Sequence, residues 1–254
     1  MNRPPLSLAG RAAIVTGAGS GIGRALAIEA AARGMAVACC DINAAGLAET
    51  EAQIAPTGAA CLARPIDIGD EDALRLFAQH IAQQLPPAAL LFANAGILRR
   101  AGILDLPIAD WEKLFAVNLL GTVRTLQTLT PLLAPPAQIV VTGSAGSMAV
   151  YPGLGAYCAT KHALWPVCDA LRTELAEAGR PIGVSMLMPG AVATHIFDHA
   201  APGRPEPADS ISPAEAARIA FEGALADRPL ILTHPAFVER AQARFAQAVA
   251  DLRQ

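Results

Sequence analysis

The stretch Thr16-Gly17-Ala18-Gly19-Ser20-Gly21-Ile22-Gly23 decides the fold of this chain. An apolar run at residues 12–15 precedes it, and a helical pattern at residues 24–31 follows it. This arrangement predicts a buried strand, a glycine turn and a helix that begins at the turn. Glycine permits backbone angles that other residues avoid, and it leaves the N–H groups at the helix N-terminus open to a phosphate. The stretch therefore predicts a dinucleotide-binding turn.

Strands and helices are expected to alternate along the whole chain. Further strands are predicted at residues 36–40, 60–63, 89–93, 138–142, 182–188 and 230–233. Helices are predicted at residues 44–54, 71–84, 109–133, 157–178, 213–226 and 235–252. Most of the strands are continuous apolar runs, which is typical of a sheet covered on both faces. We expect an α/β fold of Rossmann type: a doubly wound, mostly parallel, seven-stranded sheet with helices on both faces.

Composition narrows the range of functions. The chain has 254 residues, a net charge of −3 and a hydrophobic share of 53%, which suits a single domain over residues 1–254. Its basic residues are scattered, so no nucleic-acid partner is expected. The five cysteines lack metal-binding spacing, which predicts free thiols and no metal site. Because neither a signal peptide nor a membrane-spanning stretch is visible, we expect a cytoplasmic protein.

Asp41 follows the second predicted strand. A carboxylate at this point can accept hydrogen bonds from the adenosine ribose of NAD and repels the 2′-phosphate of NADP. The neighbouring Ile42 and Asn43 are neutral. The sequence therefore favours NAD over NADP. Asp41 could also cap the next helix, and the two roles are compatible.

Tyr157 and Lys161 lie four residues apart at the start of a predicted helix, so their side chains share one face. A nearby ammonium favours the phenolate, so Lys161 is expected to lower the pKa of Tyr157 and make it a usable acid and base. Taken alone, this spacing is also common on helix surfaces.

The order of the motifs gives this pair its weight. The glycine turn, Asn94-Ala95-Gly96, Asn118, Ser144, Tyr157-x-x-x-Lys161 and Pro189-Gly190 follow one another at fitting intervals. As a set they resemble the short-chain dehydrogenase/reductase family, over roughly residues 8–235. The resemblance implies that the catalytic residues are Asn118, Ser144, Tyr157 and Lys161.

In that resemblance each catalytic residue has a role. Tyr157 exchanges a proton with the substrate oxygen, which Ser144 holds. Lys161 lowers the tyrosine pKa and binds the nicotinamide ribose, and Asn118 supports a water that links Lys161 to solvent. Local roles remain open for some of them, since Asn118 could only cap or kink its helix and Ser144 could only end a strand.

The resemblance also implies two sets of binding residues. Those for the cofactor are Gly17, Ser20, Gly21, Ile22, Gly23, Asp41, Ile42, Asp67, Ile68, Asn94, Ala95, Gly96, Tyr157, Lys161, Pro189, Gly190, Val192 and Thr194. Those for the substrate, around a loop at residues 191–211, are Ser144, Met148, Tyr151, Leu154, Tyr157, Ile196 and Phe197.

The substrate set is mostly apolar, which favours a lipophilic secondary alcohol or its ketone, such as a hydroxysteroid or an aryl or alkyl carbinol. The leading interpretation is thus an NAD-dependent alcohol dehydrogenase that acts on a small molecule. A biosynthetic ketone reductase that accepts NADPH is a second interpretation. A nucleotide-sensing protein without turnover is a third, which the intact catalytic set disfavours. The family resemblance further implies a homodimer or homotetramer.

Several residues depart from the family pattern. Ala93 and Gly143 stand where an asparagine and a serine are common, and Pro166 is expected to bend the helix that carries Tyr157. The chain lacks the Gly-Gly ending of many relatives, which puts a tetramer in doubt. It ends instead in an amphipathic helix, which we expect near the substrate loop, with Phe237 or Phe245 closing the pocket. The histidines near the site, His162, His195 and His199, are expected to pack or face solvent.

Overall fold

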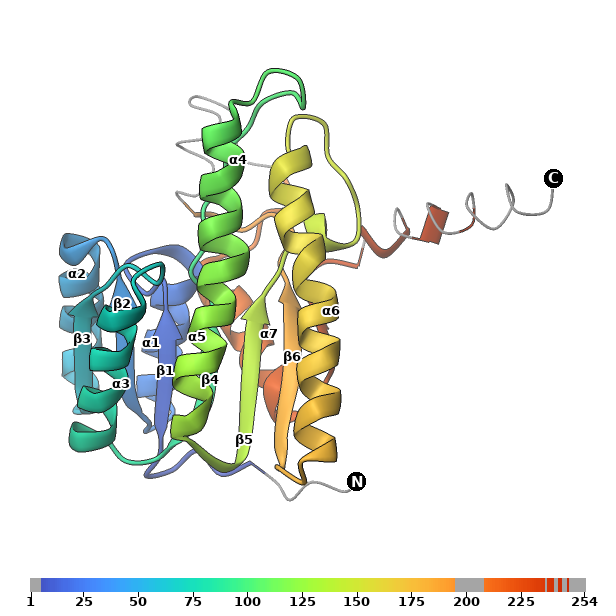
Figure 1. Ribbon diagram of the computed structural model, residues 1–254. Helices are drawn as coiled ribbons and strands as arrows, with labels where there is room; N and C mark the ends of the chain where they lie inside the picture. Colours follow the sequence, from blue (N-terminus) through green and yellow to red (C-terminus); the bar gives the residue numbers. More distant parts are fainter. Residues whose placement is uncertain (1–5, 195–207, 236, 240–241, 244–245, 247–254) are drawn as a thin grey trace.

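The computed structural model describes residues 6–194, 208–235, 237–239, 242–243 and 246. Seven parallel strands form one sheet in the order β3-β2-β1-β4-β5-β6-β7 (Figure 1). Their bounds are β1 Ala12–Thr16, β2 Ala36–Asp41, β3 Cys61–Pro65, β4 Ala88–Ala93, β5 Leu133–Thr142, β6 Ile182–Met188 and β7 Leu230–Leu232. The predicted fold class is confirmed, and every pairing between named strands is parallel.

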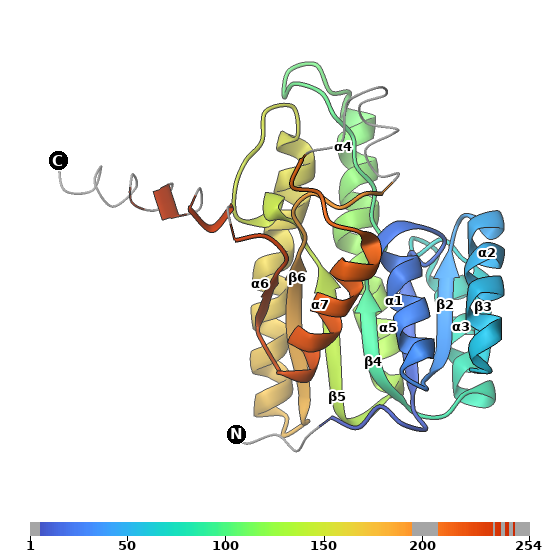
Figure 2. The same cartoon turned by 180° about the vertical axis from the view of Figure 1, so that it is seen from behind.

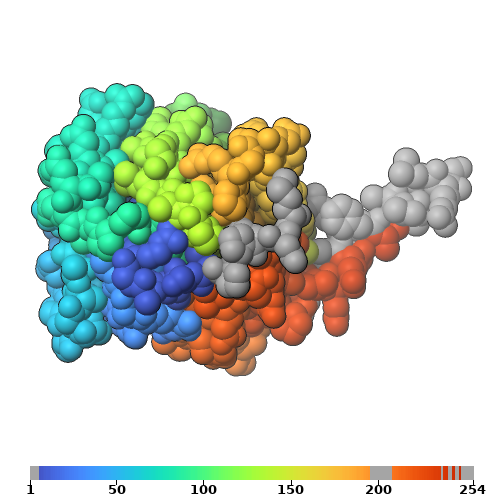
Figure 3. Space-filling model, turned by 90° about the horizontal axis from the view of Figure 1, so that it is seen from below, coloured from blue at the N-terminus to red at the C-terminus, as the bar shows by residue number. Residues whose placement is uncertain are grey.

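Helices cover both faces of the sheet. On one face lie α3 (Glu71–Gln84), α4 (Ile108–Phe115), α5 (Thr122–Leu129) and α6 (Gly155–Glu177) (Figure 1). On the other face lie α1 (Gly21–Ala32), α2 (Ala44–Ile54) and α7 (Pro213–Leu225) (Figure 2). Seen from below, the two layers pack against each other, the teal to yellow part of the chain on one side and the blue and orange-red parts on the other (Figure 3).

Each face of the sheet has its own core. Neighbouring residues of β4 show why: Leu91 belongs to the cluster beneath α3, α5 and α6, whereas Phe92 belongs to the cluster beneath α1 and α7. Side chains alternate along a strand, so a continuous apolar strand supplies both cores. On the second face the rings of Phe92 and Phe221 lie 5.0 Å apart between their centres.

The helix predicted at residues 109–133 is interrupted in the structure. α4 and α5 are separated by a π-helical turn, Ala116–Gly121, and a short 3₁₀ turn, Thr130–Leu132, follows α5. A π-helical turn inserts an extra residue into a helix, and such turns are frequent at functional sites. Hydrophobic periodicity does not reveal a single extra residue, so the sequence indicated one long helix. Asn118 lies within the π-helical turn.

One proline pair lies where no strand was expected, and Pro166 lies inside a helix, where the predicted bend stays a prediction. β5 begins at Leu133, before Pro135 and Pro136, because the pairing of β4 with β5 shifts register between Ala88 and Leu90 and tolerates prolines there. α6 continues through Pro166 over 23 residues, so the proline removes one donor without ending the helix.

The carboxyl ends of the strands bring the predicted site together. β1 ends at Thr16 before the glycine turn, β2 at Asp41, β4 before Asn94 and β5 before Ser144. The strand order reverses between β1 and β4, and in open α/β sheets ligands bind at such a switch point. No helix among the described residues is long and apolar enough to cross a membrane.

Candidate active site

The glycine turn after β1 has the backbone of an anion-binding loop. Gly17 and Gly21 have φ of 70° and 52°, which disfavour any residue with a side chain. A Cβ at Gly17 would lie 2.7 Å from the Cα of Ala95, so the turn packs directly against the end of β4. The side chain of Ser20, which precedes α1, makes no capping hydrogen bond. The turn and the start of α1 thus fit the diphosphate of a dinucleotide.

Asn94 connects three strands beside this turn. The Thr16 hydroxyl accepts hydrogen bonds from the N–H groups of Asn94 and Ala95, at 3.0 and 3.2 Å. The Asn94 amide donates to the carbonyl oxygen of Thr16 at 3.2 Å, and the Thr142 hydroxyl donates to Asn94 Oδ1 at 3.1 Å. This network aligns the ends of β1, β4 and β5. Thr16 opens the glycine stretch, but neither it nor Thr142 was among the predicted site residues.

Asp41 faces the glycine turn from the end of β2. Its two carboxylate oxygens accept hydrogen bonds from the N–H groups of Gly19 and Asn43, each at 2.8 Å. Asn43, and not Asp41, caps α2, because its side chain accepts from the N–H of Gly46. A negative charge is therefore held beside the glycine turn, at the carboxyl end of β2.

Arg24 is a cation near this position that the sequence analysis overlooked. Its guanidinium donates to the carbonyl oxygen of Gly19 at 2.6 Å and to the Thr50 hydroxyl at 3.1 Å. It also pairs with Glu49 at 2.7 Å. Because Glu49 offsets its charge, Arg24 braces the turn more than it attracts a phosphate.

Lys161 and Tyr157 lie on one face of α6, as their spacing predicts. Lys161 is 3% exposed, and its Nζ donates to the carbonyl oxygen of Thr142 at 2.8 Å. The same Nζ lies 5.9 Å from the centre of the Tyr157 ring. Lys161 is thus anchored at the end of β5, with its positive charge beside the tyrosine.

Burial shifts both of these groups away from their charged forms. It raises the pKa of Tyr157 to about 12, although a hydrogen bond with Ser144 acts in the opposite direction. It lowers the pKa of Lys161 to about 8. Desolvation of the phenolate therefore sets the direction of the Tyr157 pKa shift in the chain by itself. The expectation that Lys161 lowers this pKa stays a prediction.

Ser144 shares a side-chain hydrogen bond with Tyr157. Its hydroxyl accepts from the N–H of Gly146 at 3.0 Å, and its own N–H donates to Ser147 Oγ at 3.1 Å. These two bonds form a capping box on a short 3₁₀ turn, Ala145–Ser147. The turn fixes Ser144 where its hydroxyl can bond both Tyr157 and an approaching substrate oxygen.

Asn118 is buried and serves as a tie between segments. Its amide oxygen accepts from the N–H of Ile97 at 2.8 Å, and its amide nitrogen donates to the Ile97 carbonyl at 2.9 Å and to the Thr160 hydroxyl at 3.1 Å. A Cβ at Gly96 would lie 3.2 Å from Asn118 Oδ1 and 3.3 Å from Lys161 Nζ. The π-helical turn thus aims Asn118 toward the same space that Lys161 faces.

An apolar wall adjoins Tyr157. Leu98, Leu154, Tyr157 and Cys158 form a buried cluster, against which Tyr151 packs. The N–H of Ala101 bonds the carbonyl of Gly153 at 3.0 Å, so the segment after β4 runs along the 151–154 turn. Leu98 was not predicted. Its only signal is its place two residues after the Asn94-Ala95-Gly96 motif.

The segment after β6 closes the other side of the glycine turn. The carbonyl of Pro189 accepts from the N–H of Ala145 at 2.7 Å, which joins this segment to the Ser144 turn. A Cβ at Gly21 would lie 3.0 Å from Thr194 Cγ2. Of the two predicted nicotinamide contacts, Thr194 therefore lies against the glycine turn, and Val192 pairs with Ile211 in an isolated parallel bridge.

Comparison with known proteins agrees with this geometry. The profile of the short chain dehydrogenase family matches residues 11–204. The chain belongs to this family. Among its solved structures, a short chain dehydrogenase/reductase from Burkholderia phymatum in complex with NAD has a TM-score of 0.88 at 28% identity, covering 96% of each chain. An alcohol dehydrogenase from Thermococcus sibiricus complexed with 5-hydroxy-NADP has a TM-score of 0.74 at 26% identity, covering 82% of this chain and 87% of that one.

Curated relatives in the family include two mycobacterial proteins. An uncharacterized NAD-dependent oxidoreductase of Mycobacterium tuberculosis is 34% identical over 211 residues, which is 77% of this chain and 76% of that protein. The probable oxidoreductase EphD of the same organism is 34% identical over 185 residues, or 72% of this chain. The matched part is 31% of the length of EphD, so this chain resembles one part of that longer protein.

Other predicted site residues make local contacts, and some lie outside the described residues. Ile68 is buried against Gly121 of the π-helical turn, and Asp67 accepts from the N–H of Gly69 at 2.7 Å. His162 Nδ1 lies 2.8 Å from the carbonyl oxygen of Cys158, consistent with packing. Four predicted residues, Ile196, Phe197, His195 and His199, lie outside the described residues.

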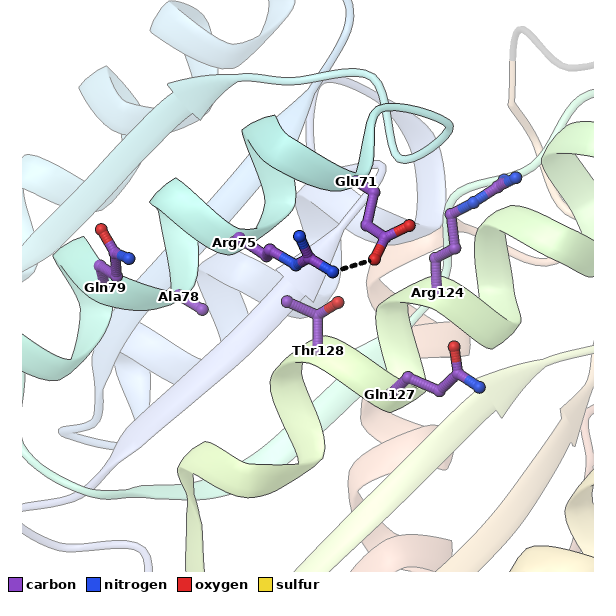
Figure 4. A pocket seen from close by; sticks show the side chains of 7 residues that line it. All are labelled: Glu71, Arg75, Ala78, Gln79, Arg124, Gln127 and Thr128. Carbon is purple, nitrogen blue, oxygen red and sulfur yellow. Dashed lines mark hydrogen bonds and ion pairs between the residues drawn. The ribbon is translucent and has the colours of Figure 1, made fainter.

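A surface groove of about 390 Å³ between α3 and α5 is separate from this site (Figure 4). Glu71 and Arg75, which form an ion pair, lie along it with Arg124 and Thr128. None of its lining residues belongs to the family motifs. Within the described residues no cluster of three or more His, Cys, Asp or Glu side chains could hold a metal ion.

Proposed function

We propose that this protein is an NAD-dependent oxidoreductase that interconverts a lipophilic secondary alcohol and its ketone. One observation carries the proposal: Tyr157 is buried beside Ser144, with the anchored ammonium of Lys161 near its ring, next to a turn that fits a dinucleotide. A bound nicotinamide would supply the acceptor or donor of a hydride. The chain itself supplies the proton, its path and the position of the substrate.

Tyr157 is proposed as the group that moves the proton. With its pKa raised to about 12, the tyrosine keeps its proton at neutral pH, which is the form that protonates a ketone oxygen. Alcohol oxidation needs the phenolate, so its rate is expected to rise with pH. Ser144 favours that form through its hydrogen bond. The charge of Lys161 nearby favours it as well.

NAD is proposed over NADP because of Asp41. Its carboxylate is held at the end of β2 by two N–H donors, and a 2′-phosphate there would meet like charge. The positive charge of Arg24 nearby is offset by Glu49.

The apolar wall supports a lipophilic substrate. Leu98, Tyr151 and Leu154 adjoin Tyr157, and Ile103 and Val150, on the neighbouring segments, are 59% and 57% exposed. An alcohol with a hydrophobic skeleton would cover such surface and gain from its burial. A panel of secondary alcohols with NAD, followed by the absorbance of NADH, tests the substrate class. Preference for small or charged alcohols over apolar ones would contradict it.

Substitution of Tyr157 tests the mechanism. Tyr157→Phe keeps the ring and removes the proton donor and acceptor, so kcat should fall by roughly 10²–10⁴-fold while the Kd of NAD stays close to that of the parent. Steady-state kinetics and titration calorimetry measure the two quantities. A variant that keeps most of its rate would refute the assigned role.

A further inference from the structure

His234 is a buried histidine that none of the family motifs includes. It follows β7 at the carboxyl edge of the sheet and is 8% exposed. Its Nδ1 lies 2.7 Å from the Thr233 hydroxyl oxygen, and its Nε2 lies 2.8 Å from the carbonyl oxygen of Asp209. Both ring nitrogens therefore have partners, each in a different segment of the edge.

The first branch of contacts leads to the Pro189-Gly190 motif. The N–H of Gly190 donates to the Thr233 hydroxyl at 2.9 Å. A Cβ at Gly190 would lie only 2.5 Å from His234 Nδ1, so the imidazole fills the space that a side chain would need. With His234 in this position, residue 190 has room only for glycine.

The hydrogen-bond partners of His234 determine which of its ring nitrogens carries the proton. The Asp209 carbonyl can only accept, so Nε2 carries the proton. Nδ1 of the neutral ring then accepts the hydroxyl proton of Thr233, whose oxygen still accepts from Gly190. Each hydrogen bond in the series from Gly190 through Thr233 and His234 to Asp209 therefore has one donor and one acceptor.

The second branch leads to the segment that faces the nicotinamide position. Two residues beyond Asp209, Ile211 pairs with the chain after Gly190: its N–H donates to the Ala191 carbonyl at 3.1 Å, and its carbonyl accepts from Ala193 at 3.0 Å. This isolated parallel bridge is centred on Val192 and Ile211. His234 therefore holds both sides of the bridge, one through Thr233 and Gly190 and the other through Asp209.

We propose that His234 is a positioning residue for the nicotinamide end of the cofactor. It acts through residues 189–194, the nicotinamide strip, and touches neither substrate nor the reacting atoms. A strip held in place before binding loses less freedom when the dinucleotide binds, which favours affinity. The inference rests on the proposed function in that this site takes a nicotinamide dinucleotide. The adenosine end, at Gly19 and Asp41, lies outside the contacts of His234.

The test compares binding at the two ends of the cofactor. His234→Phe keeps a flat ring and removes both hydrogen bonds, and His234→Gln keeps an amide that can donate to Asp209. His80→Phe, on α3, is the matched control. The Kd is measured for ADP, which carries only the adenosine end, and for NAD or NADP, whichever the parent binds more tightly. Melting temperatures report the fold.

We expect His234→Phe to raise the Kd of the dinucleotide at least tenfold and to leave that of ADP within twofold. The dinucleotide Kd of His234→Gln should lie between those of His234→Phe and the parent. The dinucleotide Kd of His80→Phe should match that of the parent. Unchanged dinucleotide binding in a folded His234→Phe would overturn the proposal, as would equal weakening of ADP and dinucleotide. If His234→Phe does not fold, the same comparison for His234→Gln decides, with threefold selective weakening expected. Because binding needs no alcohol, failure of the parent to oxidise alcohols would count against the proposed reaction alone.

Discussion

The ammonium of Lys161 is held near Tyr157 at a cost in stability. Burial lowers its pKa from 10.5 to about 8, which corresponds to about 3 kcal/mol of penalty for the charged form. The bond to the Thr142 carbonyl recovers part of that cost. A buried cation retained next to a tyrosine is more easily explained by chemistry than by folding.

Lys161→Met should separate the contribution of the ammonium to activity from its cost in stability. At pH 7 the variant should lose nearly all activity, yet its free energy of unfolding should be unchanged or up to about 2 kcal/mol higher, because the charged amine no longer needs to be buried. As pH rises from 8 toward 10.5, the folded parent releases this proton before the unfolded chain does, so the parent gains stability and the difference shrinks. Urea unfolding across this range measures it. The exposed Lys113→Met is the control, and a strongly destabilised Lys161→Met would contradict the account.

Asp41 is the residue on which cofactor choice depends. Asp41→Asn keeps a side chain that can accept from Gly19 or Asn43 but removes the charge, and Arg24 remains nearby. The preference for NAD over NADP, as the ratio of kcat/KM values, should fall by about tenfold or more, since about 1.4 kcal/mol of repulsion is lost. A parent enzyme that uses both cofactors equally well would defeat the assignment.

At the scale of elements, the ends of the strands and the irregular helix turns set the site. The π-helical turn between α4 and α5 directs Asn118 at Ile97 and Thr160, and the capping box at Ala145–Ser147 directs Ser144 at Tyr157. Both devices are local departures from regular structure. In each of these two segments a single residue, Asn118 or Ser144, belongs to the family motifs.

The segment after β7 begins in the core. Phe237 is 5% exposed and belongs to the same core cluster as Leu164 and Met188, so it is a packing residue. The described residues Gln242 and Ala243 are exposed, and Phe245 lies outside the described residues. The predicted closeness of the last helix to the substrate loop, which lies largely outside the described residues, stays a prediction.

A shortened chain tests that prediction without disturbing the core. Ending the chain after Glu239 keeps Phe237 and removes the rest of the amphipathic segment. If that segment helps to close the substrate site, KM should rise more for bulky apolar alcohols than for small ones, because the bulky ones lose more contact area. Equal KM ratios in a folded, shortened enzyme would make the segment structural only. The melting temperature of the shortened chain serves as its control.

At the scale of the whole molecule, one helical face has apolar side chains without cover. On this face α4 and α5 follow one another end to end, and α6 lies beside them (Figure 1). Ile108, on α4, is 71% exposed, and Leu120, in the π-helical turn between α4 and α5, is 48% exposed. Trp111 and Phe115 stack nearby, with ring centres 6.4 Å apart. Apolar surface of this kind is typical of an interface between subunits.

We predict that this face pairs two copies of the chain. Light scattering at micromolar concentration should give at least twice the chain mass of 26.2 kDa. Leu120→Asp should shift the mass toward a single chain, because an unpaired carboxylate would be buried in the interface. Leu225→Asp is the matched control, since Leu225 is 37% exposed on α7, which lies on the opposite face of the sheet. A parent protein that is monomeric at this concentration would contradict the prediction.

The sequence by itself determined the α/β class, the parallel sheet and the family, because strand and helix periods and glycine turns are local patterns. It also named Tyr157, Lys161, Ser144 and Asn118, since the order of motifs survives without coordinates. Only the tertiary structure decided which way the pKa of Tyr157 moves, because desolvation depends on everything packed around a side chain. It likewise revealed the π-helical turn, the brace by Arg24 and the place of His234 behind Gly190. The brace and the place of His234 join residues far apart in the chain, and no local pattern records which distant segments meet. The π-helical turn depends on one extra residue, which hydrophobic periodicity does not reveal.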